Sequence, residues 1–234
     1  MCSIELALIF LCGRVSVKCF TLCSSVRTSM FLFFFQIAKS IELLSKIITN
    51  VLTALYEPFG FSILLSFLAM FFYLYAYKPD HAGNGWKSAI VTWNTEFKSS
   101  VFFRKLFFLS FTTALILFRT LLNRNLWMNP LSDVMGGWTI WTTVNEERQL
   151  TTECIENIIM MVPFSAMVMW TFNVKEKIIW KSIKIVFLFS ISIEFLQLFL
   201  RIGTFQLSDI FYNTLGGFIG GMLYYAVMKV KKKL

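Results

Sequence analysis

Five apolar segments, each close to the length that a helix needs to cross a bilayer, limit what this chain can fold into. The composition agrees, because 57% of the 234 residues are hydrophobic, only 15% are charged and the mean hydropathy is +0.67. A soluble domain is rarely so apolar. The sequence therefore predicts an all-α integral membrane protein, a polytopic helical bundle with five to six transmembrane helices in contact with the lipid bilayer. The segments are residues 59–77, 106–122, 156–172, 182–200 and 210–228.

The basic residues predict the orientation of the bundle. Basic residues that flank membrane helices are retained on the cytoplasmic side. Thirteen of them lie in the links 78–105 and 173–184 and in the tail after residue 228. We therefore expect a multi-pass protein with its C-terminus in the cytoplasm and the loops 123–155 and 201–209 outside. Four basic residues lie on the expected outer side: Arg119, Arg124, Arg148 and Arg201.

The formal net charge of +9 has the same explanation. The basic residues are scattered between apolar segments and form no dense face alternating with aromatic residues, so no nucleic-acid partner is predicted. Cys19 and Cys23 lie at a helical spacing, but no second ligand pair accompanies them. No metal site and no cofactor are predicted.

Residues 1–58 are expected to form an N-terminal region that precedes a membrane domain over residues 59–234. We expect residues 1–29 to be weakly structured. We also expect translation to begin at Met30. Apolar residues recur every three to four positions from Ile41 to Tyr56, which predicts an amphipathic helix. This helix either lies at the membrane interface, which its charged residues favour, or completes an extra span with residues 31–38.

Polar residues at helical spacing interrupt the last two apolar segments. Glu194, Gln197 and Arg201 are at i, i+3 and i+7, so they share one stripe of a helix. Asp209 and Asn213 are at i and i+4 on the next helix. The expected orientation collects these residues near the outer end of the bundle.

Arg119 ends an earlier apolar segment on the same expected side. A carboxylate in a membrane is costly unless it is paired or reaches water, so Arg119 or Arg201 is expected to neutralise Glu194 or Asp209. Two interpretations follow. The residues form either a buried network that fixes the helix register, or a polar pocket that binds a lipid head group, a cell-wall intermediate or a glycopeptide at the outer face.

Small residues on the last segment predict close helix packing. Gly216, Gly217, Gly220 and Gly221 form two overlapping G-x-x-x-G pairs, and glycine allows another helix backbone to approach closely. Pro163 is expected to kink the helix that contains it.

The same stretch resembles the VanZ-like family of bacterial membrane proteins. In this chain, the string E-x-x-Q-x-x-x-R followed by D-x-x-x-N-x-x-G-G-x-x-G is similar to the C-terminal signature of that family. Asn157 followed by Pro163 and Phe164, and Arg119 followed by Thr120, resemble two further pieces of the family pattern. The resemblance covers roughly residues 106–228. The signature residues are Glu194, Gln197, Arg201, Asp209, Asn213, Gly216, Gly217 and Gly220.

The resemblance implies a location in the bacterial cell membrane. For the namesake of the family it implies low-level resistance to the glycopeptide teicoplanin. The chain has none of the common catalytic motifs for phosphate transfer, metalloproteolysis or serine hydrolysis. The first hypothesis is therefore a membrane protein whose outer polar pocket binds or masks an envelope component. The alternative is a membrane-embedded enzyme that acts on a lipid-linked envelope substrate, with acid–base chemistry on Glu194 and Asp209.

Overall fold

The computed structural model describes residues 35–77, 85–122, 129–144 and 147–231. The chain divides into two compact units, Met1–Thr49 and Asn50–Leu234. In the first unit, residues 35–49 are helical and carry an exposed ion pair between Lys46 and Glu42, 3.0 Å apart. The expected start at Met30 and the weak structure expected of residues 1–29 concern residues outside those that the structure describes.

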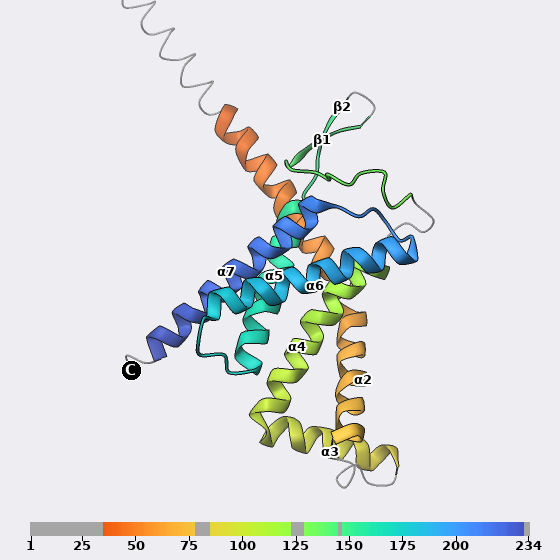
Figure 1. The fold of residues 1–234 in the computed structure, drawn as a ribbon, viewed down its shortest axis with the longest axis vertical. Helices are drawn as coiled ribbons and strands as arrows, with labels where there is room; N and C mark the ends of the chain where they lie inside the picture. The colour runs from red at the N-terminus through yellow and green to blue at the C-terminus, as the bar shows by residue number, and fades with distance from the viewer. Residues whose placement is uncertain (1–34, 78–84, 123–128, 145–146, 232–234) are drawn as a thin grey trace, which may run out of the picture. The chain divides into compact units, whose positions relative to one another are not determined.

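The second unit is built from helices (Figure 1). Residues 50–56 are helical and end at a turn over residues 57–58, in agreement with the predicted helix to Tyr56. A single π-helical turn, η2 (Phe118–Leu122), extends α4 at its C-terminal end. The α-helices after residue 58 are α2 (Phe59–Tyr77), α3 (Trp86–Ser99), α4 (Val101–Leu117), α5 (Glu153–Thr171), α6 (Ile178–Leu200) and α7 (Leu207–Lys231).

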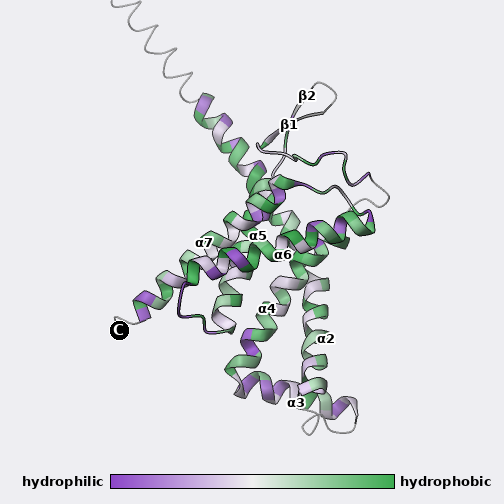
Figure 2. Ribbon diagram, viewed as in Figure 1, coloured by the Kyte–Doolittle hydropathy of each residue, from purple (hydrophilic) through white to green (hydrophobic). Residues whose placement is uncertain are grey.

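Within the described residues, four helical segments are long and apolar enough to cross a membrane: residues 35–77, which include the turn at 57–58, and residues 101–122, 153–171 and 178–200. Helix α7 is longer than three of them, with 25 residues and a length of about 37 Å. It is not among the four because glycine, asparagine and lysine lower its hydropathy. The predicted all-α membrane bundle is confirmed. Figure 2 shows apolar residues along much of α2, α4 and α6.

Burial in the second unit follows the order expected of a protein in lipid. Large apolar side chains face outward, with Phe72 77% exposed and Phe199 85% exposed. Small polar side chains are buried instead, among them Ser62, Ser66 and Ser190 at 0%. Such an outward apolar surface is unfavourable in water and favourable against acyl chains.

Helices α2 and α4 pack side by side, and α3 joins their ends (Figure 1). The sequence analysis treated residues 78–105 as a link and missed α3. Its Trp93 and Phe97 rings stack 4.9 Å apart and pack against a small core that includes Phe103. The ring of Trp93 also lies 4.7 Å from that of Phe67 on α2. Aromatic contacts of this kind hold α3 against the α2–α4 pair.

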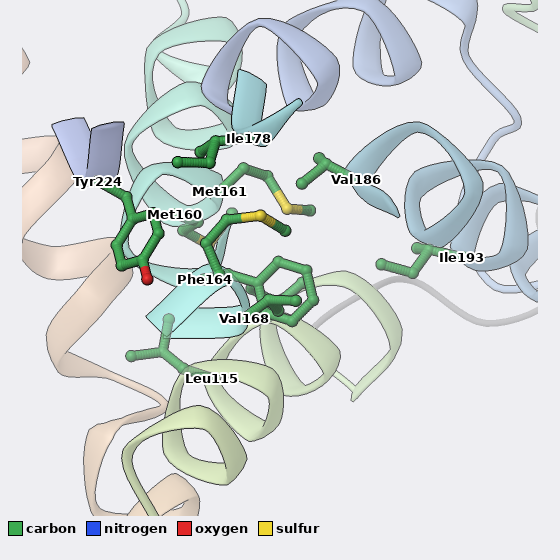
Figure 3. Packing of buried hydrophobic residues seen from close by; sticks show 11 residues of the cluster. Leu115, Met160, Met161, Phe164, Val168, Ile178, Val186, Ile193 and Tyr224 are labelled. Atoms are coloured by element: carbon green, nitrogen blue, oxygen red, sulfur yellow. The ribbon is translucent and has the colours of Figure 1, made fainter. Parts of the chain in front are cut away.

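The main core lies where α5 packs between α4 and the α6–α7 pair (Figure 3). Met160, Met161 and Phe164 of α5 project from one helix into this core. Val186 and Ile193 of α6 contribute side chains to the same cluster. Burial of such side chains excludes lipid and water from the centre of the bundle.

Helix α7 packs closely against two helices through adjacent glycine columns. A Cβ atom on Gly216 or Gly220 would lie 2.6 Å or less from backbone or side-chain oxygens of α5. A Cβ atom on Gly217 or Gly221 would lie 2.7 Å from side chains of α6. The two overlapping G-x-x-x-G pairs therefore serve two different neighbours. The hydroxyl of Ser182 donates a 2.7 Å hydrogen bond to the carbonyl of Gly217 across this contact.

A hairpin and the loop over residues 129–134, which we call the pinned loop, lie near the end of the bundle where α4 ends and α7 begins. Strands β1 (Trp141–Val144) and β2 (Glu147–Leu150) pair antiparallel, an element that the sequence analysis missed. The backbone N–H of Phe205 donates to the carbonyl of Pro130 at 2.8 Å. The backbone N–H of Leu207 donates to the carbonyl of Val134 at 2.9 Å. These bonds fix the loop onto the α6–α7 connection.

Pro163 does not interrupt its helix, because α5 continues as an α-helix from Glu153 to Thr171. The proline lies on an exposed face, away from the glycine contact. The predicted apolar segments have the correct order, but α4 begins at Val101 and α6 at Ile178, several residues before the predicted starts.

Gly220→Ala tests the close packing of α7. The added methyl would meet the Ser165 hydroxyl and the Val162 carbonyl, so we expect a loss of about 1–3 kcal/mol of stability. Thermal unfolding in detergent measures this change. Gly60→Ala is the matched control, because a Cβ atom on Gly60 meets nothing within 4 Å. Equal stability of the two variants would contradict the proposed packing role.

Candidate functional site

A buried ion pair joins η2 to the first turn of α5. Arg119 Nη2 lies 2.5 Å from Glu156 Oε2, and the Glu156 side chain is only 7% exposed. The second carboxylate oxygen accepts a 2.6 Å hydrogen bond from the Thr152 hydroxyl. Both oxygens of this carboxylate are thus satisfied, as burial of the charge requires.

The π-helical turn creates the second contact. A π-turn disturbs the regular i to i−4 hydrogen bonds and occurs frequently at functional sites. The carbonyl of Thr120, within this turn, accepts a 2.7 Å hydrogen bond from the side-chain amide of Gln197 on α6. The Gln197 side chain therefore bonds directly to the backbone of η2. Gln197 itself is 2% exposed.

Two more amide side chains connect α7 to its neighbours. Asn157 on α5 donates a 2.9 Å hydrogen bond to Asp209 Oδ1 in the first turn of α7. One turn further along α7, Asn213 donates to the Ser190 hydroxyl of α6 at 2.8 Å. All four side chains are buried, at 8% exposure or less. These short side chains can meet only because the glycine columns bring the helices close together.

Glu194 lies one turn after Ser190 on α6 and is 2% exposed. Its Oε2 atom accepts a 2.8 Å hydrogen bond from the backbone N–H of Gln206, just before α7 begins. The Gln206 side chain donates to Asp133 Oδ2 at 3.2 Å in the pinned loop. The carboxylate of Glu194 therefore connects α6, the start of α7 and the loop.

Four side-chain contacts close a circuit through η2, α5, α7 and α6. We call this set, together with Glu194, the interhelical polar network. Its links run from η2 to α5, from α5 to α7, from α7 to α6 and from α6 back to η2. The pairs are Arg119–Glu156, Asn157–Asp209, Asn213–Ser190 and Gln197–Thr120.

Three buried oxygen atoms in or beside the network have no hydrogen-bond partner among the described residues. They are Gln197 Oε1, Asn213 Oδ1 and Ser208 Oγ. Each belongs to a side chain that is at most 3% exposed. A buried polar atom without a partner costs about 1–3 kcal/mol, so these atoms favour the approach of hydrogen-bond donors.

The structure brings most of the predicted site residues together, but not all. Arg119, Glu194, Gln197, Asp209 and Asn213 belong to the network. Arg201 does not join its buried part, because it ends α6 in a left-handed conformation, with φ of 54°, and its side chain is exposed.

Arg119 pairs with a carboxylate that the sequence analysis did not select. The prediction named Glu194 or Asp209 as its partner, whereas the structure provides Glu156. Glu156 was missed because it lies at the edge of an apolar segment, where an acidic residue is common. Its position beside Asn157, which had been selected, was the available signal. Ser190 was missed because one small polar residue in an apolar segment has no pattern of its own. Thr120 was noted only as part of the resemblance, and it contributes here through its backbone carbonyl, which any residue would supply.

The fold and this network define a class: a polytopic membrane protein whose apolar helices are joined near one end by buried polar side chains. The chain belongs to the VanZ/LLP1 family, whose sequence profile matches residues 6–229. The match is wider than the resemblance over residues 106–228 and includes the N-terminal region.

A curated relative is Protein VanZ of Enterococcus faecium, to which the chain is 33% identical over 72 residues. The alignment covers 31% of this chain and 44% of that protein, less than half of either. No solved structure matches the chain.

Arg119→Met tests the buried ion pair. It leaves the Glu156 carboxylate buried without its cation, so we expect a loss of about 3–5 kcal/mol of stability. The double variant Arg119→Met/Glu156→Leu removes both charges and should lose less than Arg119→Met alone. Unfolding by a denaturing detergent measures both. Lys46→Met, which breaks an exposed pair, serves as control and should cost less than about 1 kcal/mol. A loss of stability in the double variant as large as, or larger than, the loss in Arg119→Met alone would contradict the pairing.

Proposed function

We propose that this protein binds a component of the bacterial cell envelope at the outer face of the cell membrane. In this proposal, the interhelical polar network and the exposed Arg201 form the binding site. The binding masks the envelope component and contributes to resistance to the glycopeptide teicoplanin. Membership in the VanZ/LLP1 family and the similarity to Protein VanZ support the link to resistance.

The observation that carries the proposal is the set of buried acceptor atoms without donors. The amide oxygens of Gln197 and Asn213 lie in a network that otherwise satisfies its charged groups. Saccharides, peptides and lipid head groups present O–H and N–H donors to such acceptors. A head group, a cell-wall intermediate and a glycopeptide all have this chemistry. Arg201 adds a positive charge at the exposed edge for an anionic group.

The proposed orientation places the network outside and the C-terminus in the cytoplasm. Helices α2, α5 and α7 end on the side where most basic residues lie, and the network lies at the opposite ends of α5 and α7. Retention of basic residues in the cytoplasm then exposes the network end to the envelope.

Cysteine labelling tests this orientation. Arg201→Cys and Lys177→Cys are placed separately in a chain whose five native cysteines are replaced by serine. Both positions are exposed and both have a left-handed backbone, so the two substitutions are matched. In intact cells, a membrane-impermeant maleimide should label the cysteine at 201. The cysteine at 177 should react only after the membrane is permeabilised. The reverse pattern would remove the basis for an outward site.

The alternative function is an enzyme acting on a lipid-linked envelope substrate. Glu194 and Asp209 are both buried near the start of α7, where paired carboxylates can act as acid and base. Glu194→Asp distinguishes the two functions because it keeps the charge and shortens the reach. Proton transfer depends strongly on that reach, whereas binding tolerates the change better.

Teicoplanin susceptibility tests the proposed function. A strain that expresses the protein should be less susceptible than the same strain without it. Glu194→Gln and Asp209→Asn keep hydrogen-bonding groups but remove the charges, and we expect each to return susceptibility to that of the strain without the protein. Lys181→Gln is the control, because Lys181 is exposed on α6 far from the network. The amount of protein in the membrane is measured for each variant. Unchanged resistance in both network variants at normal abundance would refute the proposal.

A further inference from the structure

A second candidate site lies at the opposite end of the bundle, between α4, α5 and α7. It is a groove of about 620 Å³. Its walls are mainly apolar and include Met167, Leu223 and Val227, while Lys105 and Lys231 lie at the groove as well. The lining contains two lysines and, among the described residues, no acidic side chain.

Lys105 is a buried ammonium group without a described carboxylate partner. The residue is 8% exposed. Its Nζ atom donates to the carbonyl of Trp170 at 3.0 Å and to Asn173 Oδ1 at 3.3 Å, and it lies 5.0 Å from the centre of the Trp170 ring. An ammonium group has three donors, so these two neutral oxygens leave one donor for a ligand.

The C-terminal end of α5 explains part of this arrangement. A cation near a helix C-terminus is stabilised by the partial negative charge there, equivalent to about half an elementary charge. Lys105 reaches the last turn of α5 through Trp170. Lys231 adds a second full charge to the same groove. The groove therefore has an excess of positive charge that the described protein groups do not neutralise.

We infer that this groove binds one anionic phospholipid, with its phosphate at Lys105 and Lys231 and an acyl chain along α5 and α7. The position supports a lipid, because Lys105 lies near the start of α4 and Lys231 ends α7, at the depth expected for head groups. The apolar walls continue from these lysines towards the middle of both helices. Basic pockets between membrane helices on the cytoplasmic side are typical sites for anionic lipids.

Native mass spectrometry of the full-length protein tests this inference. The protein is purified in detergent and mixed with equal amounts of phosphatidylglycerol and phosphatidylcholine that have the same acyl chains. We expect phosphatidylglycerol to be retained about tenfold more than phosphatidylcholine, as contacts to a charged group allow. Lys105→Gln should abolish this preference. Lys231→Gln, at an exposed position whose loss does not threaten the fold, should reduce it to roughly threefold.

Lys184→Gln is the matched control, because it removes one exposed lysine of α6 outside the groove and should keep the full preference. Glycerol phosphate, which has the charge but no acyl chain, should not displace the lipid. Equal retention of the two lipids by the natural protein would overturn the inference. Displacement by glycerol phosphate, or a loss of preference in Lys184→Gln as large as in Lys231→Gln, would overturn it too.

Discussion

The close approach of α7 to both α5 and α6 is the contact on which the rest of the structure depends. Four glycines on two adjacent columns of α7 replace side chains with backbone, and each column faces a different helix. The hydrophobic effect does not drive helices together in lipid, so packing and hydrogen bonds must do so. The glycines make both possible. At this separation, Asn213 reaches Ser190 and Asn157 reaches Asp209 with side chains of only a few atoms.

The interhelical polar network then selects one arrangement of the bundle. Apolar contacts between lipid-facing helices tolerate rotation and sliding, whereas a buried hydrogen bond fails when its partner moves by one turn. A circuit through η2, α5, α7 and α6 makes each helix depend on two others. The π-turn of η2 takes part in this circuit, because the side-chain amide of Gln197 on α6 donates a hydrogen bond to the carbonyl of Thr120 within the turn. The same network carries both the structural role and the proposed binding role.

Residue patterns were sufficient to predict the membrane bundle, and they pointed to four of the residues that the structure places in the interhelical polar network. The apolar segments had to be long because a bilayer accepts only helices that satisfy their own backbone groups. Glu194, Gln197, Asp209 and Asn213 were identifiable because ionisable and amide side chains rarely occur in such segments without a reason.

The remainder depends on information that is absent from local patterns. Helix α3 was missed because lysine, threonine and asparagine dilute its apolar residues, and its aromatic contacts come from α2 and α4. The starts of α4 and α6 were placed too late because Lys105 and Lys181 were read as link residues. Glu156 was not identified as the partner of Arg119, since the pair is 37 residues apart and forms only in the folded bundle. Arg201 lies outside the network because α6 ends at Leu200 and Arg201 has a left-handed backbone, a change of direction that the i, i+3 and i+7 spacing does not reveal.

Two buried cations connect α4 and its extension η2 to α5, and they are stabilised in different ways. Near one end, Arg119 reaches across to the Glu156 carboxylate, so the contact is neutral in sum. Near the other end, Lys105 reaches across to carbonyl and amide oxygens, which hold the ammonium group in place but do not neutralise it. Both cations belong to the α4–η2 segment and both partners to the α5 side, about 21 Å apart along the helix. The two helices cannot slide against each other without breaking both contacts. At one end of this helix pair the Arg119 charge is therefore neutralised by Glu156. At the other end the Lys105 charge is not neutralised, and it is left for a ligand in the groove.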